Sequence, residues 1–194
     1  MGKTSAMNND VSFEEEMEEE ILTEESEKEF LARHIDGYQK ILSDFRGLKD
    51  NRKRYFDINR AALSAYMLGL FDEAELLAKE IFELAEKYPN TWNYGNSIYY
   101  GNWVLGMLEL DKGNTEKSKE YLLLAGACNG SPQLNSFGPN MRLAKRLLLK
   151  GEIETVTKFL NLIATFWTSG SNWLKIWRKM IDEGKQPNCL MHIF

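Results

Sequence analysis

The chain has 194 residues, a formal net charge of −5 and a pI near 5.3, and 43% of its residues are hydrophobic. This length and composition fit one globular domain with its own core and exclude a wholly disordered chain. Only four prolines and an abundance of Ala, Leu, Glu and Lys favour an all-α fold. The acidic balance disfavours nucleic acid as a partner, since proteins that bind duplexes normally present a basic face.

The sequence also indicates the cellular compartment in which we expect the protein. It contains no run approaching the ~20 apolar residues of a membrane span, and its N-terminus lacks the apolar segment of a signal peptide. Cys128 and Cys189 show neither metal-ligand spacing nor a partner pattern. We therefore expect a cytoplasmic protein with reduced thiols, no metal and no cofactor, and we leave monomer or homodimer open.

Residues 1–26 predict an acidic arm that is partly disordered or helical. A block of glutamates runs from Glu14 to Glu20, and such a run of like charges is usually solvated. Phe13, Met17 and Ile21 nevertheless recur at helical spacing. An alternative is an arm that competes with a nucleic acid or covers a basic partner.

Residues 27–184 predict a helical domain that begins with a helix from Glu27 to Leu48. A basic cluster follows, and its simplest role is to neutralise nearby acidic groups or the end of that helix. Phosphate binding is the alternative, although the sequence has no glycine-rich loop beside the cluster. Its members are Arg46, Lys49, Arg52, Lys53 and Arg54.

Three helical hairpins follow, at residues 55–88, 94–125 and 139–166. Each is broken by a glycine, which supplies the permissive backbone that a tight turn between helices needs. A small residue lies seven positions before each of these glycines, where a neighbouring helix can approach closely. The turn glycines are Gly69, Gly113 and Gly151, and the small residues are Ala62, Gly106 and Ala144.

This pattern resembles the tetratricopeptide repeat, in which small residues and a turn glycine recur at such offsets. The three glycines are 44 and 38 residues apart, whereas that repeat has a period of about 34. The GSPQLNSFGPNM stretch, with LAKRLLLKGE and FLNLIATFW, also resembles an uncharacterised bacterial tetratricopeptide-like family over residues 95–167. The resemblance implies antiparallel hairpins stacked as a short right-handed superhelix, and it implies no reaction.

A final helix from Ser171 to Glu183 carries Trp173 and Trp177 on one apolar face. A helical solenoid must cover its last apolar face, so we expect this helix to be a C-terminal cap. The tail, residues 185–194, is expected to dock on the body or on a partner.

The first helix of each hairpin lines the concave surface of tetratricopeptide folds, and by that resemblance it would form a binding groove here. Amide side chains suit a peptide backbone, aromatic side chains suit apolar residues, and cations suit carboxylates. The alternative for the apolar members, Trp103 above all, is a place in the core. The expected groove residues are Asn59, Arg60, Tyr66, Tyr100, Trp103, Arg142 and Lys145.

The linker at residues 126–140 is long and rich in amide and hydroxyl groups, and ordered loops of such length are often functional. It is expected either to reach over the groove or to satisfy its polar groups internally. In the second case Asn135 or Ser136 would cap the third hairpin. The candidate side chains are Asn129, Gln133, Asn135, Ser136 and Asn140.

Together these features favour a non-enzymatic module that binds a protein or peptide in its groove. An acidic immunity or inhibitor protein, which neutralises a basic toxin or nuclease, is the alternative. An enzyme is the third possibility, but the two histidines, His34 and His192, are far apart and the sequence offers no carboxylate–histidine pair at metal-binding spacing.

Overall fold

The computed structural model describes residues 24–187, and within this range the regular secondary structure is entirely helical. The predicted all-α fold is confirmed. Most of the predicted acidic arm and the tail from residue 188 lie outside the described residues. The helices are α2 (Glu24–Arg46), α3 (Asn51–Met67), α4 (Phe71–Lys87), α5 (Tyr94–Asp111), α6 (Thr115–Gly126), α7 (Pro132–Phe137), α8 (Arg142–Leu149), α9 (Ile153–Ile163), η1 (Thr168–Gly170) and α10 (Ser171–Asp182).

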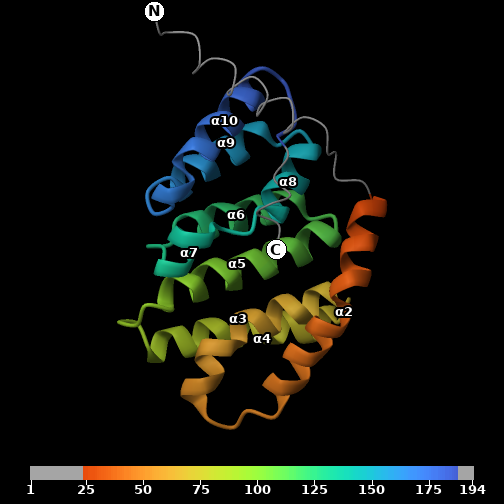
Figure 1. The fold of residues 1–194 in the computed structure, drawn as a ribbon, viewed down its shortest axis with the longest axis vertical. Helices are drawn as coiled ribbons and strands as arrows, with labels where there is room; N and C mark the ends of the chain where they lie inside the picture. Colours follow the sequence, from red (N-terminus) through yellow and green to blue (C-terminus); the bar gives the residue numbers. More distant parts are fainter. Residues whose placement is uncertain (1–23, 188–194) are drawn as a thin grey trace, which may run out of the picture.

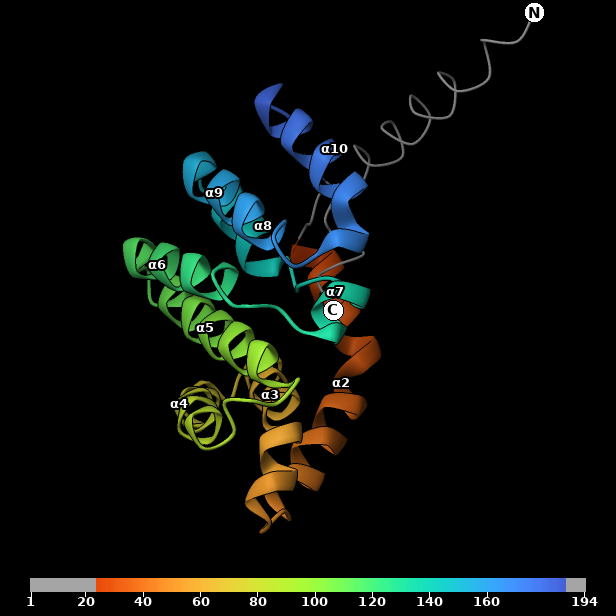
Figure 2. The same ribbon diagram turned by 90° about the vertical axis from the view of Figure 1, so that its left-hand side faces the viewer.

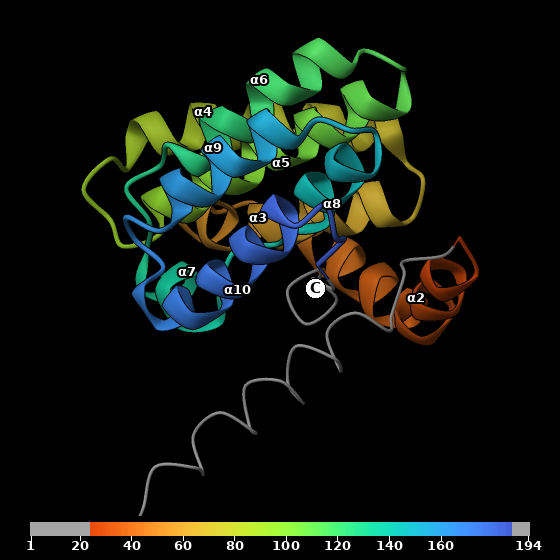
Figure 3. The same cartoon turned by 90° about the horizontal axis from the view of Figure 1, so that it is seen from above.

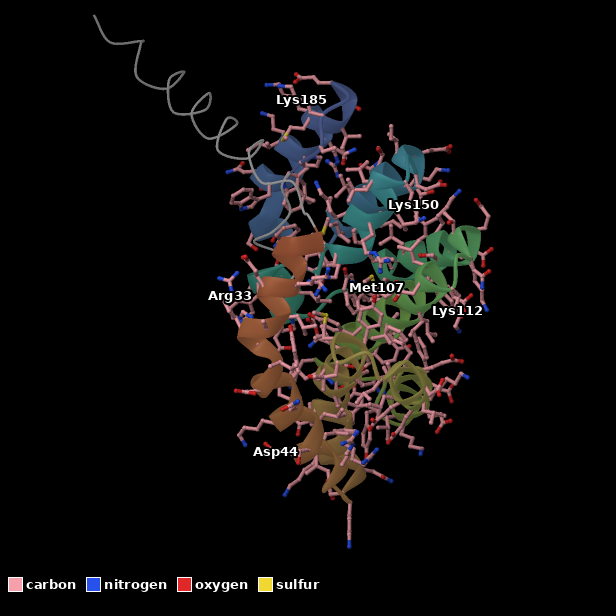
Figure 4. All side chains as sticks on the ribbon, turned by 90° about the vertical axis from the view of Figure 1, so that its right-hand side faces the viewer. Arg33, Asp44, Met107, Lys112, Lys150 and Lys185 are labelled. Carbon is pink, nitrogen blue, oxygen red and sulfur yellow. The ribbon has the colours of Figure 1, made fainter. Side chains whose placement is uncertain are left out.

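Three helical hairpins, α3–α4, α5–α6 and α8–α9, are stacked along the long axis of the molecule (Figure 1). Figures 2 and 3 show α4, α6 and α9 on one side and α2, α7 and α10 on the other, with α3, α5 and α8 between them. The middle helices are therefore covered on both sides. This arrangement explains why α5 buries residues all round its circumference, including Tyr99, Trp103 and Met107 (Met107 is labelled in Figure 4).

The three predicted turn glycines all adopt positive φ angles, at 73° for Gly69, 83° for Gly113 and 86° for Gly151. This left-handed region is costly for residues with a Cβ atom, so each hairpin depends on glycine where it reverses direction. Each turn is short enough to bring consecutive helices together in antiparallel fashion, as the sequence predicted.

Close packing between α5 and α6 depends on Gly106. A Cβ atom there would lie 2.5 Å from Leu143 Cδ2 and 3.1 Å from Tyr121 Cβ. Ser118 faces the same position from α6, and its hydroxyl donates to the Gly106 carbonyl at 2.8 Å. The small residue predicted at this position therefore serves the close approach of two helices.

Two of the five residues of the basic cluster, Arg46 at the end of α2 and Arg54 in α3, form internal ion pairs. Arg46 Nε donates to Glu73 at 2.9 Å, and Arg54 reaches Glu80 at 2.7 Å, so both tie this end of the chain to α4. The interpretation as charge neutralisation fits these contacts, although the acidic partners lie on α4 rather than in the N-terminal block.

The C-terminal helix packs on α9, with Trp177 buried 5.8 Å from the ring of Trp167. Phe71, the first residue of α4, is 46% exposed, with its ring 5.7 Å from that of Tyr66. Within residues 24–187, none of the helices has the length and apolar character needed to cross a membrane.

Candidate functional site

A pocket of about 360 Å³ lies between α2, α3, α5 and α7, and we call it the amide pocket. Its volume is within the usual range for ligand sites, roughly 300–1,000 Å³. Helix α3 supplies the largest part of its wall, and α7 closes one side. The lining residues are Tyr38, Ile41, Phe56, Asn59, Arg60, Leu63, Ser64, Trp92, Asn93, Asn96, Tyr100, Gln133, Leu134, Phe137 and Gly138.

Two polar side chains of α3 line this pocket without hydrogen-bond partners in the described part of the chain. Asn59 is 5% exposed, and its Oδ1 atom is buried and accepts nothing. The hydroxyl of Ser64 is fully buried and equally unpaired. Buried polar groups are normally satisfied, because leaving one unpaired costs about 1–3 kcal/mol. Both groups belong to residues that line the pocket, and a ligand can supply the missing bond once neighbouring side chains move to expose them.

The amides across the pocket from Asn59, by contrast, bond to one another. Asn93 donates to the Tyr55 carbonyl at 2.9 Å, and Asn96 donates to Asn93 Oδ1 at 3.0 Å. Asn96 also bonds to Gln133 and accepts from the Ser131 hydroxyl at 2.6 Å. This network holds α7 against the start of α5 and fixes the wall that faces Asn59.

Aromatic rings form the outer part of the pocket. Phe56 and Trp92 stack with centroids 5.4 Å apart, and Trp92 is still 50% exposed. Phe137, at the end of α7, is 79% exposed. Large aromatic side chains that stay in water beside a pocket are typical of protein-binding sites.

Tyr38 and Tyr100 also line the pocket, and neither hydroxyl group makes a hydrogen bond within residues 24–187. Burial raises the pKa of Tyr100 to about 12 and raises the pKa of Tyr38, although Arg142 opposes the second shift. Both phenols are therefore protonated near neutral pH, so each can donate a hydrogen bond to a ligand.

Arg60 lies at the junction between the amide pocket and a second pocket of about 440 Å³, the flanking pocket. Its guanidinium is exposed and forms no ion pair with any residue between 24 and 187. The flanking pocket is lined by Gly37, Lys40, Ile41, Asp44, Phe45, Leu48, Asp57 and Arg60. Asp44 is already paired there with Lys40 at 2.8 Å.

Three of the predicted groove residues, Asn59, Arg60 and Tyr100, come together in the amide pocket, and the other four do not. Trp103 is fully buried in the core, which was the alternative interpretation. Arg142 is 7% exposed and Lys145 is 2% exposed. The expectation that these side chains line an open groove is corrected, because α2 and the chain after α10 cover them.

The contacts of Arg142 and Lys145 show how they are covered. The Arg142 guanidinium lies 5.9 Å from the ring centroid of Phe30 in α2, and its Nη1 contacts Met67 Sδ at 3.2 Å. Lys145 Nζ donates to the Pro187 carbonyl at 2.7 Å. Each cation is thereby used to hold a neighbouring segment in place.

Tyr66 also has a structural partner. Its hydroxyl donates to Asp111 at 2.8 Å and accepts from Arg146 at 3.1 Å, and Arg146 reaches Asp111 at 2.7 Å. Burial raises the pKa of Tyr66, with the nearby Arg146 opposing that shift. This triad links the three hairpins through α3, α5 and α8, so it serves the fold rather than an open site.

The linker contains a short helix, α7, that the sequence analysis did not predict. Ser131 caps it by accepting from the Leu134 amide at 3.0 Å, and Pro132 follows at its first position. Gln133 then projects into the amide pocket. Pro at the first helical position after a serine was the local signal for this helix.

The other linker candidates lie outside the pocket. Asn135 accepts from the amide and hydroxyl of Thr168 at 2.9 and 2.8 Å, and Asn140 accepts from the Arg142 amide at 3.0 Å. The expectation that Asn135 or Ser136 caps the third hairpin is wrong, since Asn135 joins α7 to η1 and Ser136 is exposed. Asn129 is exposed as well.

Chemistry based on a reactive cysteine finds no support at Cys128, which is buried and free. Burial raises the pKa of its thiol to about 11, so the nucleophilic thiolate is scarce near neutral pH. The described residues contain no group of three or more His, Cys, Asp or Glu side chains arranged to hold a metal ion.

Sequence reasoning missed Ser64, Asn96, Trp92 and Phe137 as members of the site. Trp92 stands in an Asn- and Pro-containing junction and Phe137 precedes a glycine, so their exposure could have been suspected. Ser64 gave no such signal, because its position depends on how α2 and α5 pack against α3.

Comparison of the chain with protein-family models, with curated proteins and with solved structures gives no match.

Proposed function

We propose that this protein is a non-enzymatic binding module that holds an extended segment of a partner protein in the amide pocket. The observation that carries the proposal is the buried carboxamide of Asn59, whose oxygen lacks a partner among the described residues. A side-chain amide has one donor and one acceptor side, which matches the N–H and C=O of a peptide unit. A peptide would therefore satisfy the group that the fold leaves open.

Three further features support a peptide as the ligand. The hydroxyls of Ser64, Tyr38 and Tyr100 add further unused hydrogen-bonding groups around Asn59. Trp92 and Phe137 provide exposed apolar surface at the rim. A site with a few polar groups inside an aromatic frame is suited to hold a backbone in one orientation while it buries a side chain.

The fold class is also part of the proposal. We infer a tetratricopeptide-like superhelix, supported by the positive φ angles of the three turn glycines and by the close contact at Gly106. The covering of α8 by α2 distinguishes this chain from the open groove that the resemblance implies. A cytoplasmic location and a protein or peptide partner complete the proposal.

The proposal is tested by selecting peptides from a random dodecapeptide library on the immobilised protein and measuring their affinities by calorimetry. We expect enriched peptides to bind the wild type and to lose about 1–3 kcal/mol, roughly 5- to 150-fold in Kd, with Asn59→Leu. The matched control is Ser43→Leu, an exposed position of α2 outside both pockets. Equal affinity for wild type and Asn59→Leu would remove the amide pocket as the binding site.

A further inference from the structure

The charge and geometry of α3 restrict which peptide the amide pocket can hold, and this inference rests on the proposed function. Arg60 is the cation at the pocket, and it makes no ion pair within the described chain. Most other arginines beside α3 are already engaged, as Arg54 is by Glu80 at 2.7 Å. An unpaired guanidinium next to a binding pocket is suited to a carboxylate, which it can bind through two parallel hydrogen bonds.

The position of acidic residues determines on which side of Arg60 a carboxylate would lie. Asp44 and Asp57 line the flanking pocket, and among residues 24–187 no Asp or Glu lines the amide pocket. Asp44 is neutralised there by Lys40, whereas Asp57 has no ion pair within residues 24–187, so a ligand carboxylate in the flanking pocket would meet the like charge of Asp57. It is therefore favoured on the amide-pocket side of Arg60, close to Asn59.

The spacing along α3 then gives the register of the peptide. Phe56 and Arg60 are four residues apart, so they lie about 6 Å apart along the helix axis. In an extended peptide, side chains on one face recur every two residues, or about 6.6 Å. A peptide parallel to α3 can thus place one side chain on the Phe56–Trp92 aromatic pair and another on Arg60, with the intervening peptide unit next to Asn59.

We propose that the amide pocket selects an extended segment of a partner protein in which a bulky apolar residue and an acidic residue are separated by one position. The apolar side chain packs against Phe56 and Trp92, and the carboxylate pairs with Arg60. The peptide unit between them exchanges hydrogen bonds with the Asn59 carboxamide.

The test is the peptide selection repeated on three variants of the full chain. Arg60→Gln removes the charge, Arg60→Glu reverses it, and Arg52→Glu reverses the charge of another exposed arginine of α3 that lines neither pocket. Because Arg60 is exposed, these changes leave folding intact, which thermal unfolding by circular dichroism verifies.

We expect the wild type and Arg52→Glu to enrich the same peptides, with Asp or Glu two positions from a large apolar residue. Arg60→Glu should enrich Lys or Arg at that acidic position. When the acidic residue of a selected peptide is changed to the corresponding amide, the affinity for the wild type should fall about tenfold. The affinity for Arg60→Gln should be the same for the acidic peptide and its amide version.

Two other results would overturn the inference, and they are distinguishable. The wild type could enrich peptides that depend on Asn59 but carry no acidic residue at this spacing, or Arg60→Glu could enrich the same peptides as the wild type. Either result would overturn the assigned ligand and leave the proposed binding function standing. A failure of the wild type to enrich any peptide would overturn both.

Discussion

The face of α3 at the amide pocket and the interface between α5 and α6 differ in whether their buried polar side chains have hydrogen-bond partners. Ser118 and Ser64 are both fully buried, yet Ser118 donates to Gly106 at 2.8 Å whereas Ser64 has no partner in the described structure. Asn93 is bonded and Asn59 is not. Ser97 and Trp103 on α5 also bury an unpaired polar atom in the described structure, but neither lines the amide pocket. Asn59 and Ser64 differ in that they do line this pocket, and this position is what links them to a ligand.

The largest expected effect comes from Gly95, where the bonded wall of the pocket is closest packed. A methyl group there would overlap the backbone carbonyl of Gly130, which cannot move as a side-chain end could. We expect Gly95→Ala to lower the free energy of unfolding by about 3 kcal/mol and to displace α7. Chemical denaturation measures this loss.

The control for that change is Gly37→Ala. A Cβ atom at Gly37 meets nothing within 4 Å on the exposed face of α2. The same substitution should there raise the free energy of unfolding by about 0.5–1 kcal/mol. Similar losses at both positions would show that the Gly95 contact is not what fixes the wall.

Asn59 and Asn93 provide the next test of the comparison. Asn59→Leu removes an unsatisfied buried amide, so we expect it to leave stability unchanged or to raise it by about 1 kcal/mol. Asn93→Leu removes an amide bonded at 2.9 and 3.0 Å, and should lower it by about 1–3 kcal/mol. Urea denaturation of both variants measures the difference. A clear loss with Asn59→Leu would mean that its amide is satisfied within the protein.

The paired serines should give a smaller difference in the same direction. Ser118→Ala loses one internal hydrogen bond and should cost about 1 kcal/mol. Ser64→Ala loses none and should be neutral or slightly stabilising. Thermal unfolding of the two variants side by side checks this, and equal destabilisation would contradict the assignment of Ser64 to the ligand site.

The smallest expected effect concerns Glu109 of α5, whose carboxylate accepts hydrogen bonds from Asn114 and Lys112. Hydrogen bonds from Asn114 and then Lys112 lower the pKa of this carboxyl, despite its burial. Its stabilising contribution is therefore present above the ordinary glutamate value of 4.5 and is lost as the pH falls through its lowered pKa. Glu109→Gln should be less stable than the wild type by about 1 kcal/mol near neutral pH, with the gap closing in acid.

Glu120→Gln is the control for this prediction, because Glu120 is exposed and forms no ion pair within residues 24–187. Denaturation curves recorded over a range of pH values give the comparison. A gap between wild type and Glu109→Gln that stayed constant with pH would contradict the assignment.

Much of the fold could be predicted because its signals are local. Gly69, Gly113 and Gly151 follow the ends of helices and have positive φ angles, which glycine adopts at the least cost. Gly106 and Ser118 are small residues at the contact between two helices. Such features depend on a few neighbouring residues, and the sequence shows them directly. The order of hairpins followed from the same signals.

The site could be predicted only in part, since exposure on a helix depends on what comes to cover it. The helix over residues 27–48 was predicted, but its place against α8 was not, so Arg142 was expected in an open groove and is buried beside Phe30. Asn59 and Arg60 were identified by their chemistry. The lack of a partner for Asn59 depends on the packing of four helices and could not be read from the sequence.

The most direct test of the ligand site is an NMR titration that follows the ¹⁵N-labelled side-chain amide of Asn59, assigned by its disappearance in Asn59→Leu. On addition of a selected peptide, we expect the Asn59 side-chain resonances to shift with the same saturation curve as the peptide affinity, while those of Asn93 change little. Saturation of binding without any shift at Asn59 would contradict the claim that its open carboxamide is the group the ligand satisfies.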